Sequence, residues 1–326
     1  MPMSTNSDIA ALGGHTMGTQ WSVKLVAARS RDLHPLHAGI QAELDRVVAQ
    51  MSTWEADSDI SHYNRAAANS WQALPDDFWN VLSTARDIAE RSAGAFDPSI
   101  GPLVALWGFG ADAGVQAVPD PARLAEVAAR CGWHKLQLQP QTHSALQPGG
   151  LQLDLSAIAK GYGVDVVSRW LRRNGIDAAL VEVGGELHGY GLKPDGQPWR
   201  VLVESAPEED AGADYPPRVL ALDDLAVATS GDRWHHFERD GVSYSHTLDP
   251  RSHAPVSRAA AAVTVIARDA MHADAWATAL TVMGAEQGLA FAKAQDLAAR
   301  FITRTGNGLL ETMTPAFQHH LDASTQ

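Results

Sequence analysis

Cysteine is almost absent from this sequence of 326 residues. The single one, Cys131, excludes an internal disulfide, a CxxC redox pair and a thiolate zinc cluster. Basic residues are also scarce, because 25 Lys and Arg face 38 Asp and Glu, and the formal net charge is -13. Such a charge disfavours nucleic acid as the main partner, since contacts to a phosphate backbone need concentrated Lys and Arg. One phosphorylated ligand, held locally by backbone amides and a metal ion, remains compatible with it.

Long apolar runs are missing too. No window of the sequence reaches the roughly 18 apolar residues of a membrane span, so we expect none. The N-terminal stretch MPMSTNSDIAALGGHTMGTQ has no basic segment followed by an apolar run, and so carries neither a secretory nor a lipoprotein signal. We therefore expect a cytoplasmic protein, or a periplasmic one if a leader has been removed.

What the sequence does contain is a mixture of helical and strand patterns. Its composition, 45% hydrophobic and 19% charged, is sufficient for a sizeable buried core. Apolar residues at helical spacing predict helices at 37–54, 76–94, 157–175 and 273–295. Alternation predicts strands at 19–27, 178–191, 198–206, 222–231 and 261–267, and a hairpin at 135–155. Hairpins beside long helices favour an α+β or mixed α/β fold, with a helix layer against a sheet.

The sequence shows no clear linker between domains. We therefore predict one compact domain over residues 14–312, preceded by an N-terminal tail (1–13) and followed by a C-terminal tail (313–326).

A carboxylate and a hydroxyl lie four residues apart in RDAMHADAWATAL, at Asp274 and Thr278. If a helix begins near Ala273, both side chains lie on one face of its first turns. Hard oxygen ligands of this kind, with water and a phosphate oxygen, suit Mg²⁺ better than zinc. The alternative is that Asp274 only caps the helix or favours its start.

Two further stretches could approach a phosphorylated ligand. In LQLDLSAIAKGYG a strand ends at Leu155 and a helix follows, so free amides and Lys160 would lie at a helix N-terminus, a natural anion site. In VEVGGELHGYG the adjacent Gly184 and Gly185 would let the backbone come close to a flat ligand. An ordinary strand-to-helix joint and a tight turn are the alternatives. The fingerprints GxxxxGK[ST], GxGxxG and GxSxG are absent.

The stretch YSHTLDPRSHAPVS, residues 244–257, has the composition of a loop and places His246 just after a predicted strand. A neutral imidazole at the mouth of a loop is a good general base. A single histidine can equally be structural.

These patterns occur in one order with several others, and their series resembles the ApbE family of FAD:protein FMN transferases over roughly residues 14 to 295. The motifs are HTMGTQW (15–21), MSTWEADSDISHYNR (51–65), GAFDPSIGPLVALWGFG (94–110), LDLSAIAKGYGVD (153–165), VEVGGELHGYG (181–191), ATSGD (228–232), SHTLDP (245–250) and ADAWATAL (273–280).

The resemblance implies a T-fold-like architecture and a Mg²⁺-dependent enzyme that has FAD as its substrate. Such enzymes transfer FMN to a Thr or Ser hydroxyl of a target protein, such as a flavoprotein subunit of a redox enzyme, and release AMP. Two alternatives share the same site: an FAD pyrophosphatase that uses water as acceptor, and a carrier that binds FAD without catalysis.

The resemblance also assigns roles by motif. Residues expected to contact FAD are Met17 and Trp54 at the flavin, Ala95, Phe96 and Asp97, Asp154 and Lys160 at the nucleotide, Glu186, and Val256. The metal is expected on the carbonyl of Ala157 and on Asp274 and Thr278, with Asp274 and His246 catalytic and His246 taking the proton of the acceptor hydroxyl.

One position departs from the pattern of the family. Many members have glycine in the loop where this chain has His253, within DPRSHAP. If the backbone there has a positive φ, His253 is modestly strained. The shape of this loop, and with it the choice of acceptor, is where we expect the chain to differ.

Overall fold

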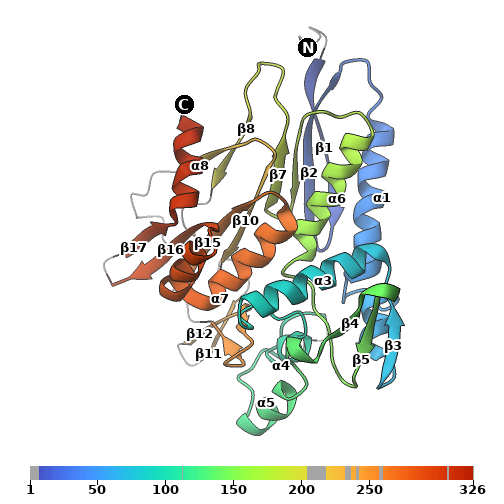
Figure 1. The fold of residues 1–326 in the computed structure, drawn as a ribbon, viewed down its shortest axis with the longest axis vertical. Coiled ribbons are helices and arrows are strands. Elements are labelled where there is room, and N and C mark those ends of the chain that lie inside the picture. Colours follow the sequence, from blue (N-terminus) through green and yellow to red (C-terminus); the bar gives the residue numbers. More distant parts are fainter. Residues whose placement is uncertain are drawn as a thin grey trace.

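The computed structural model describes residues 7–111, 113–203, 218–231, 236–239, 242–256, 260–306 and 308–325. Its centre is an eight-stranded sheet in which every neighbouring pair is antiparallel (Figure 1). The strand order is β1 (Ser7–Thr16), β2 (Thr19–Ala28), β6 (Ala179–Val183), β7 (Glu186–Tyr190), β10 (Leu225–Gly231), β15 (Ala260–Ala267), β16 (Ala298–Thr305) and β17 (Gly308–Met313). The predicted α+β class is confirmed.

Three long helices cover one face of this sheet: α1 (His34–Met51), α6 (Ala159–Arg173) and α7 (Ala270–Ala294) (Figure 1). Alternation along the strands explains the choice of face, because Trp21, Val23 and Leu25 of β2 are buried against Ile40 and Leu44 of α1. The two helix residues are one turn apart, so they form a single apolar stripe.

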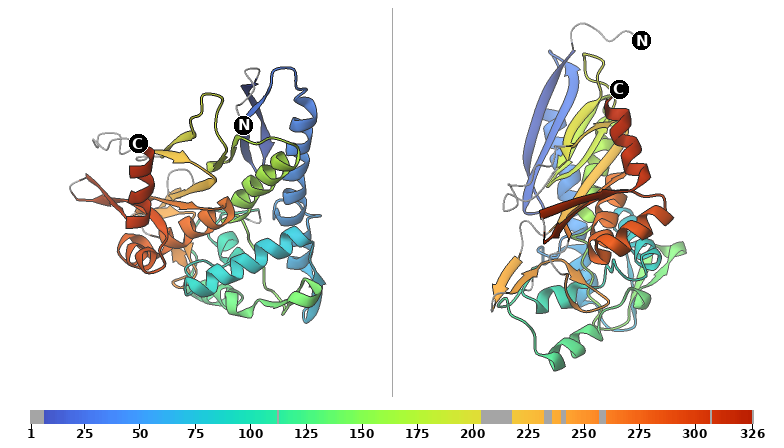
Figure 2. Two further views of the ribbon diagram at one scale, coloured as in Figure 1. Left: turned by 45° about the horizontal axis from the view of Figure 1, so that its top comes forward. Right: turned by 90° about the vertical axis from the view of Figure 1, so that its left-hand side faces the viewer.

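Among the described residues, the elements that pack on the opposite face are β8 (Trp199–Val203), β9 (Arg218–Leu222) and α8 (Pro315–Thr325). Leu220 and Leu222 pack there with Phe317 of α8 and Ala298 of β16. Figure 2 shows the long β1–β2 hairpin at one edge of the sheet and α8 near the C-terminus.

Below the sheet in Figure 1 lies a second group of shorter elements around α3 (Asp76–Arg91). The group comprises α2 (Asp59–Arg65), α4 (Gly101–Leu106), α5 (Pro121–Ala128), η1 (Trp133–Lys135), η2 (Pro140–Thr142), β3 (Ser70–Ala73), β4 (Gln137–Gln139) and β5 (Ser144–Gln147), with the short hairpins β11 (His236–Arg239)–β12 (Val242–Ser245) and β13 (Leu248–Asp249)–β14 (Ala254–Pro255). The predicted hairpin is present as β4–β5, whereas residues 151–155, which we expected to be a strand, form no strand.

Both predicted tails are wrong within the described residues. Residues 7–13 belong to β1, which pairs with β2 from Ser7 opposite Ala28 onward. At the other end, α8 buries Phe317 and Leu321, and the Thr314 hydroxyl accepts a hydrogen bond from the Phe317 amide. These two apolar residues are four apart, a helical signal that the tail prediction overlooked. No helix in the described part of the chain is long and apolar enough to cross a membrane.

Candidate active site

The N-termini of α6 and α7 meet beside the start of β7. The Gly161 amide, in the first turn of α6, donates a hydrogen bond to a carboxylate oxygen of Asp274 on α7 at 3.0 Å. Lys160, the residue before it, forms an ion pair with Glu186 of β7. The structure thus brings together three residues that the sequence assigned to one site, from three separate elements. We call Lys160, Glu186 and Asp274 the acidic cluster.

The acidic cluster holds more carboxyl groups than cations, and both carboxyl side chains are buried. Asp274 is 5% exposed and Glu186 is 3% exposed. Burial raises the pKa of both carboxyls, and the charge of Asp274 raises the pKa of Glu186 further. Burial alone would lower the pKa of Lys160, but Asp274 and Glu186 outweigh it and the pKa is raised. One ammonium therefore faces two carboxyl groups, an arrangement that an added cation would stabilise.

The oxygen atoms at and beside the acidic cluster are of the kind that fits a magnesium ion. One oxygen of Glu186, Oε2, is buried without a hydrogen-bond partner, which is costly unless something binds there. Asp274 and Thr278 share a face of α7, and Ala157 lies in the turn that leads into α6. In the described part of the chain no three His, Cys, Asp or Glu side chains cluster as a metal cage. A site built from a carboxylate, a hydroxyl, a carbonyl, water and substrate phosphate is the usual alternative for Mg²⁺.

The helix that carries Asp274 is capped by another residue. It begins at Ala270, and the Asp269 side chain accepts the hydrogen bond of the His272 amide at 2.9 Å. Asp274 therefore lies in the second turn, and the alternative that it only caps the helix is wrong. Its carboxylate is oriented toward α6 instead.

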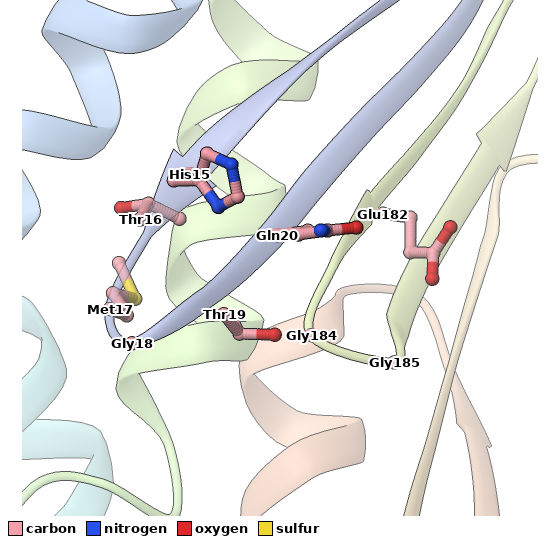
Figure 3. A pocket seen from close by; sticks show the side chains of 9 residues that line it. All are labelled: His15, Thr16, Met17, Gly18, Thr19, Gln20, Glu182, Gly184 and Gly185. Atoms are coloured by element: carbon pink, nitrogen blue, oxygen red, sulfur yellow. The ribbon is translucent and has the colours of Figure 1, made fainter.

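An open cavity of about 670 Å³ lies at the turns that join β1 to β2 and β6 to β7 (Figure 3). Its lining residues are His15, Thr16, Met17, Gly18, Thr19, Gln20, Glu182, Gly184 and Gly185. In Figure 3 the Thr19 side chain points toward the Gly184–Gly185 turn. A Cβ atom on Gly184 would lie 3.3 Å from Cδ of Lys160, so the glycine turn that lines the cavity lies against one residue of the acidic cluster.

Met17 stands at the tip of the β1–β2 turn with a positive φ of 48°. Its methyl group lies against α6, since a Cβ atom on Gly163 would be 3.2 Å from Met17 Cε. A contact of Met17 with a bound flavin stays a prediction. Sequence reasoning missed Thr19 and Gln20 as lining residues, although both belong to the HTMGTQW motif that singled out Met17.

The loop that carries Ala95, Phe96 and Asp97 is buried and lies beside Asp154, whose amide donates to the Pro98 carbonyl at 2.8 Å. Asp97 accepts hydrogen bonds from the Ser99 amide and hydroxyl and from the Trp133 amide. Burial raises the pKa of Asp97 against the effect of these donors. Asp97 thus fixes the shape of the loop, and a contact of these residues with FAD stays a prediction.

His246 follows β12, as predicted, and its ring meets Phe109 edge-on with 6.4 Å between ring centroids. The loop after it is braced: the Val256 amide donates to the Thr247 carbonyl, and Trp107 Nε1 donates to the His253 carbonyl. The φ of His253 is 60°, so the strain expected from a side chain in a glycine-type position is present.

Other contacts tie this loop to the rest of the site. Arg251 pairs with Asp249 through two hydrogen bonds of 2.9 Å, and also donates to the Val282 carbonyl on α7 at 3.4 Å. Its Cγ would lie 4.0 Å from a Cβ on Gly94, which borders the Ala95–Asp97 loop. Trp54, in contrast, stands 71% exposed after α1, and its role at the flavin stays a prediction.

Comparison with known proteins identifies the family. The model of the ApbE family matches residues 17–301, so the chain belongs to the ApbE family, as its motifs indicated. Among similar proteins are the FAD:protein FMN transferase of Vibrio cholerae serotype O1, 37% identical over 95% of this chain and 92% of the relative, and that of Haemophilus influenzae, 34% identical over 95% and 91%.

Solved structures agree. The flavinyl transferase ApbE of Pseudomonas stutzeri, in its apo form, superimposes with a TM-score of 0.89 at 38% identity, covering 98% of this chain and 99% of that one. The flavin transferase ApbE of Vibrio cholerae gives a TM-score of 0.89 at 35% identity and covers 97% and 100%. The similarity extends over both the sheet and the elements below it.

Proposed function

We propose that this chain transfers the FMN half of FAD to a Thr or Ser hydroxyl of a target protein and releases AMP, with Mg²⁺ bound at Asp274. The observation that carries the proposal is the buried acidic cluster beside an open cavity, in a chain similar over nearly its full length to FAD:protein FMN transferases. A buried excess of carboxyl groups is typical of a site completed by a cation.

In the proposed reaction the acceptor hydroxyl oxygen attacks the phosphorus of the FMN half. The bond from this phosphorus to the bridging oxygen breaks, and AMP leaves with that oxygen. The imidazole of His246 takes the hydroxyl proton, which is the role of a general base and is typically worth about 10²–10⁴-fold in rate. The product is a phosphodiester between FMN and the target protein.

The chain's own residues hold the pyrophosphate. Mg²⁺ on Asp274, Thr278 and the Ala157 carbonyl would neutralise charge on the phosphate oxygens. Lys160 supplies a second positive charge, and its ion pair with Glu186 fixes where that charge lies. The Gly184–Gly185 turn, with φ values of 59° and 103°, leaves room for the ligand to approach the backbone.

The test is FAD turnover by the purified protein with Mg²⁺, with and without a domain that carries a candidate acceptor threonine, read by mass spectrometry. We expect an FMN-sized mass gain on the acceptor that is lost in Asp274→Ala and His246→Ala. His62→Ala, at an exposed histidine of α2, is the matched control and should keep full activity.

Two other outcomes would contradict transfer. FAD cleavage to free FMN and AMP with an unlabelled acceptor, across a panel of acceptor domains, would favour a pyrophosphatase. Tight FAD binding without turnover under any of these conditions would leave a carrier. Activity retained in both Asp274→Ala and His246→Ala would overturn the roles assigned to these residues.

A further inference from the structure

Asp165, in the second turn of α6, is a buried carboxylate that the proposed chemistry does not use. Its two oxygens accept hydrogen bonds from the backbone amides of Ala270 at 2.8 Å and Met271 at 3.0 Å. These amides are the first two of α7 and have no partner within their own helix. Asp165 therefore caps α7 from the neighbouring helix.

The capping is mutual. Asp274 of α7 accepts the amide of Gly161, which lies in the first turn of α6. Each helix thus contributes a carboxylate to the free amides at the start of the other. Asp274 lies one turn beyond Ala270 and Gly161 lies one turn before Asp165, so the two contacts stand side by side along the helix–helix interface.

The two helices also touch too closely to slide. A Cβ atom on Gly161 would lie 2.2 Å from the Ala270 carbonyl oxygen and 2.8 Å from the Met271 amide nitrogen. Such distances are well inside van der Waals contact, so the backbones meet directly. Once the hydrogen bonds of Asp165 and Asp274 fix the rotation of α7, this close contact leaves the two helices little freedom to move against each other.

Keeping the Asp165 carboxylate buried lowers the stability of the folded protein. Burial raises its pKa to about 7, although two backbone amides donate to it. The start of α7 already has a cap of its own in Asp269, which receives the His272 amide. A second, buried carboxylate is therefore more than helix formation alone requires.

We propose that Asp165 is a positioning residue: by capping α7 in return for the cap that Asp274 places on α6, it holds the Asp274 carboxylate beside Lys160 in the orientation that binds the metal. The metal part of this inference rests on the proposed function. The coupling between the two caps does not, and it can be tested without metal or substrate.

The first test is amide hydrogen exchange on Asp165→Asn, which keeps the size of the side chain but offers only one acceptor oxygen. We expect the amides of Ala270 and Met271 to exchange faster, and the amide of Gly161 to do so as well, by about three- to tenfold. Asp165 does not bond to Gly161, so a merely local role would leave that amide unchanged. Asp274→Ala should, in return, speed exchange at Ala270 and Met271.

Ser168→Ala is the matched control for this test. Ser168 is also buried on α6, but its hydroxyl donates only to the Val164 carbonyl of its own helix, at 2.8 Å. It should leave the Gly161 amide as in the unaltered protein. Faster exchange at Gly161 in Ser168→Ala as well would indicate general loosening of α6 and overturn the inference.

The second test is Mn²⁺ binding, followed by electron paramagnetic resonance without FAD. Asp165→Asn should weaken Mn²⁺ binding by about tenfold or more, the effect usual for groups that orient a metal ligand. Ser168→Ala should bind as the unaltered protein does. Equal affinity in a folded Asp165→Asn protein would overturn the positioning role.

The two proposals fail in different ways. If the unaltered protein binds no Mn²⁺, the metal role of Asp274 fails, while the exchange result at Gly161 still decides whether the caps are coupled. If the unaltered protein binds Mn²⁺ and Asp165→Asn binds it equally well, the metal site stands and the role of Asp165 is wrong.

Discussion

Two groups of charged side chains, each partly buried, lie on opposite faces of the central sheet, and the ratio of carboxyl groups to cations is reversed between them. In the acidic cluster, Glu186 and Asp274 share one ammonium, that of Lys160. On the face covered by α8, Glu311 of β17 lies between Arg218 and Arg300, with an Arg300 Nε to Glu311 Oε1 distance of 2.6 Å. We call Arg218, Glu311 and Arg300 the arginine cluster.

The pKa values of the carboxyl groups diverge accordingly. Burial alone would raise the pKa of Glu311, but hydrogen bonds from Arg218 and Arg300 outweigh it and the pKa is lowered. At Glu186 burial and Asp274 together raise the pKa despite Lys160. Burial of a carboxylate therefore does not by itself mark a functional site. An excess of carboxyl groups over cations marks one, because it leaves a cation to be supplied from outside.

The largest expected difference between the clusters is in catalysis. Asp274→Ala should lower FAD cleavage by about 10²-fold or more, because the phosphate charge loses its metal ligand. Glu311→Gln should leave the rate within about threefold, since its cluster serves folding. Steady-state rates of AMP release at saturating Mg²⁺ decide this. A large loss of rate in a folded Glu311→Gln protein would contradict the assignment of catalysis to the acidic cluster and of folding stability to the arginine cluster.

Folding stability should show the reverse. Glu311→Gln replaces a carboxylate that receives hydrogen bonds from two guanidinium groups, so we expect the free energy of unfolding to fall by about 2–3 kcal/mol. Asp274→Ala should lower the free energy of unfolding by less, because it removes a buried carboxyl group from a cluster that holds more carboxyl groups than cations. Urea unfolding of both variants at neutral pH measures the contrast, and an equal loss in the two would contradict it.

Metal binding should stabilise the acidic cluster alone. At Mg²⁺ about ten times above its Kd, the free energy of unfolding should rise by about 1.4 kcal/mol in the unaltered protein and in Glu311→Gln. Asp274→Ala should show no such gain, and EDTA should reverse it in the others. Thermal unfolding with and without Mg²⁺ provides the measurement. A gain that survives in Asp274→Ala would place the metal elsewhere.

The smallest expected effect concerns pH. The folded-state pKa of Glu311 is lowered, so its stabilising contribution is present above the unfolded pKa, near 4.5, and is lost as pH falls through the folded value. The stability difference between the unaltered protein and Glu311→Gln should therefore be constant near neutral pH and shrink in acid. A difference that grew as pH fell would mean that the two arginines do not lower this pKa.

Local patterns predicted in which helices and strands the candidate residues lie, but little of how these elements meet. The spacing of Asp274 and Thr278, the place of Lys160 in a first helical turn, and His246 after a strand were all readable from the sequence. The pairing of Lys160 with Glu186 and of Gly161 with Asp274 joins residues 26 and 113 positions apart, which depends on how strands and helices pack. Single-sequence periodicity carries no information about that packing.

Some signals were present and were not used. Asp269 stands three residues before His272, which is the pattern of a helix cap and sets the start of α7. The arginine cluster had no local signal, since Arg218 and Glu311 are 93 positions apart. Asp165 likewise belonged to a motif, LDLSAIAKGYGVD, in which only Asp154, Ala157 and Lys160 were assigned roles.

The close approach of Gly161 to Ala270 has a consequence for how this sequence can vary. Every single-codon change at position 161 that replaces glycine adds a Cβ atom, and any Cβ there overlaps the Ala270 carbonyl. Gly161 can therefore be replaced in evolution only if α7 first moves away from α6. A related chain with alanine at the equivalent place would have to carry compensating changes along α7, and its own sequence would reveal that its two helices are set farther apart.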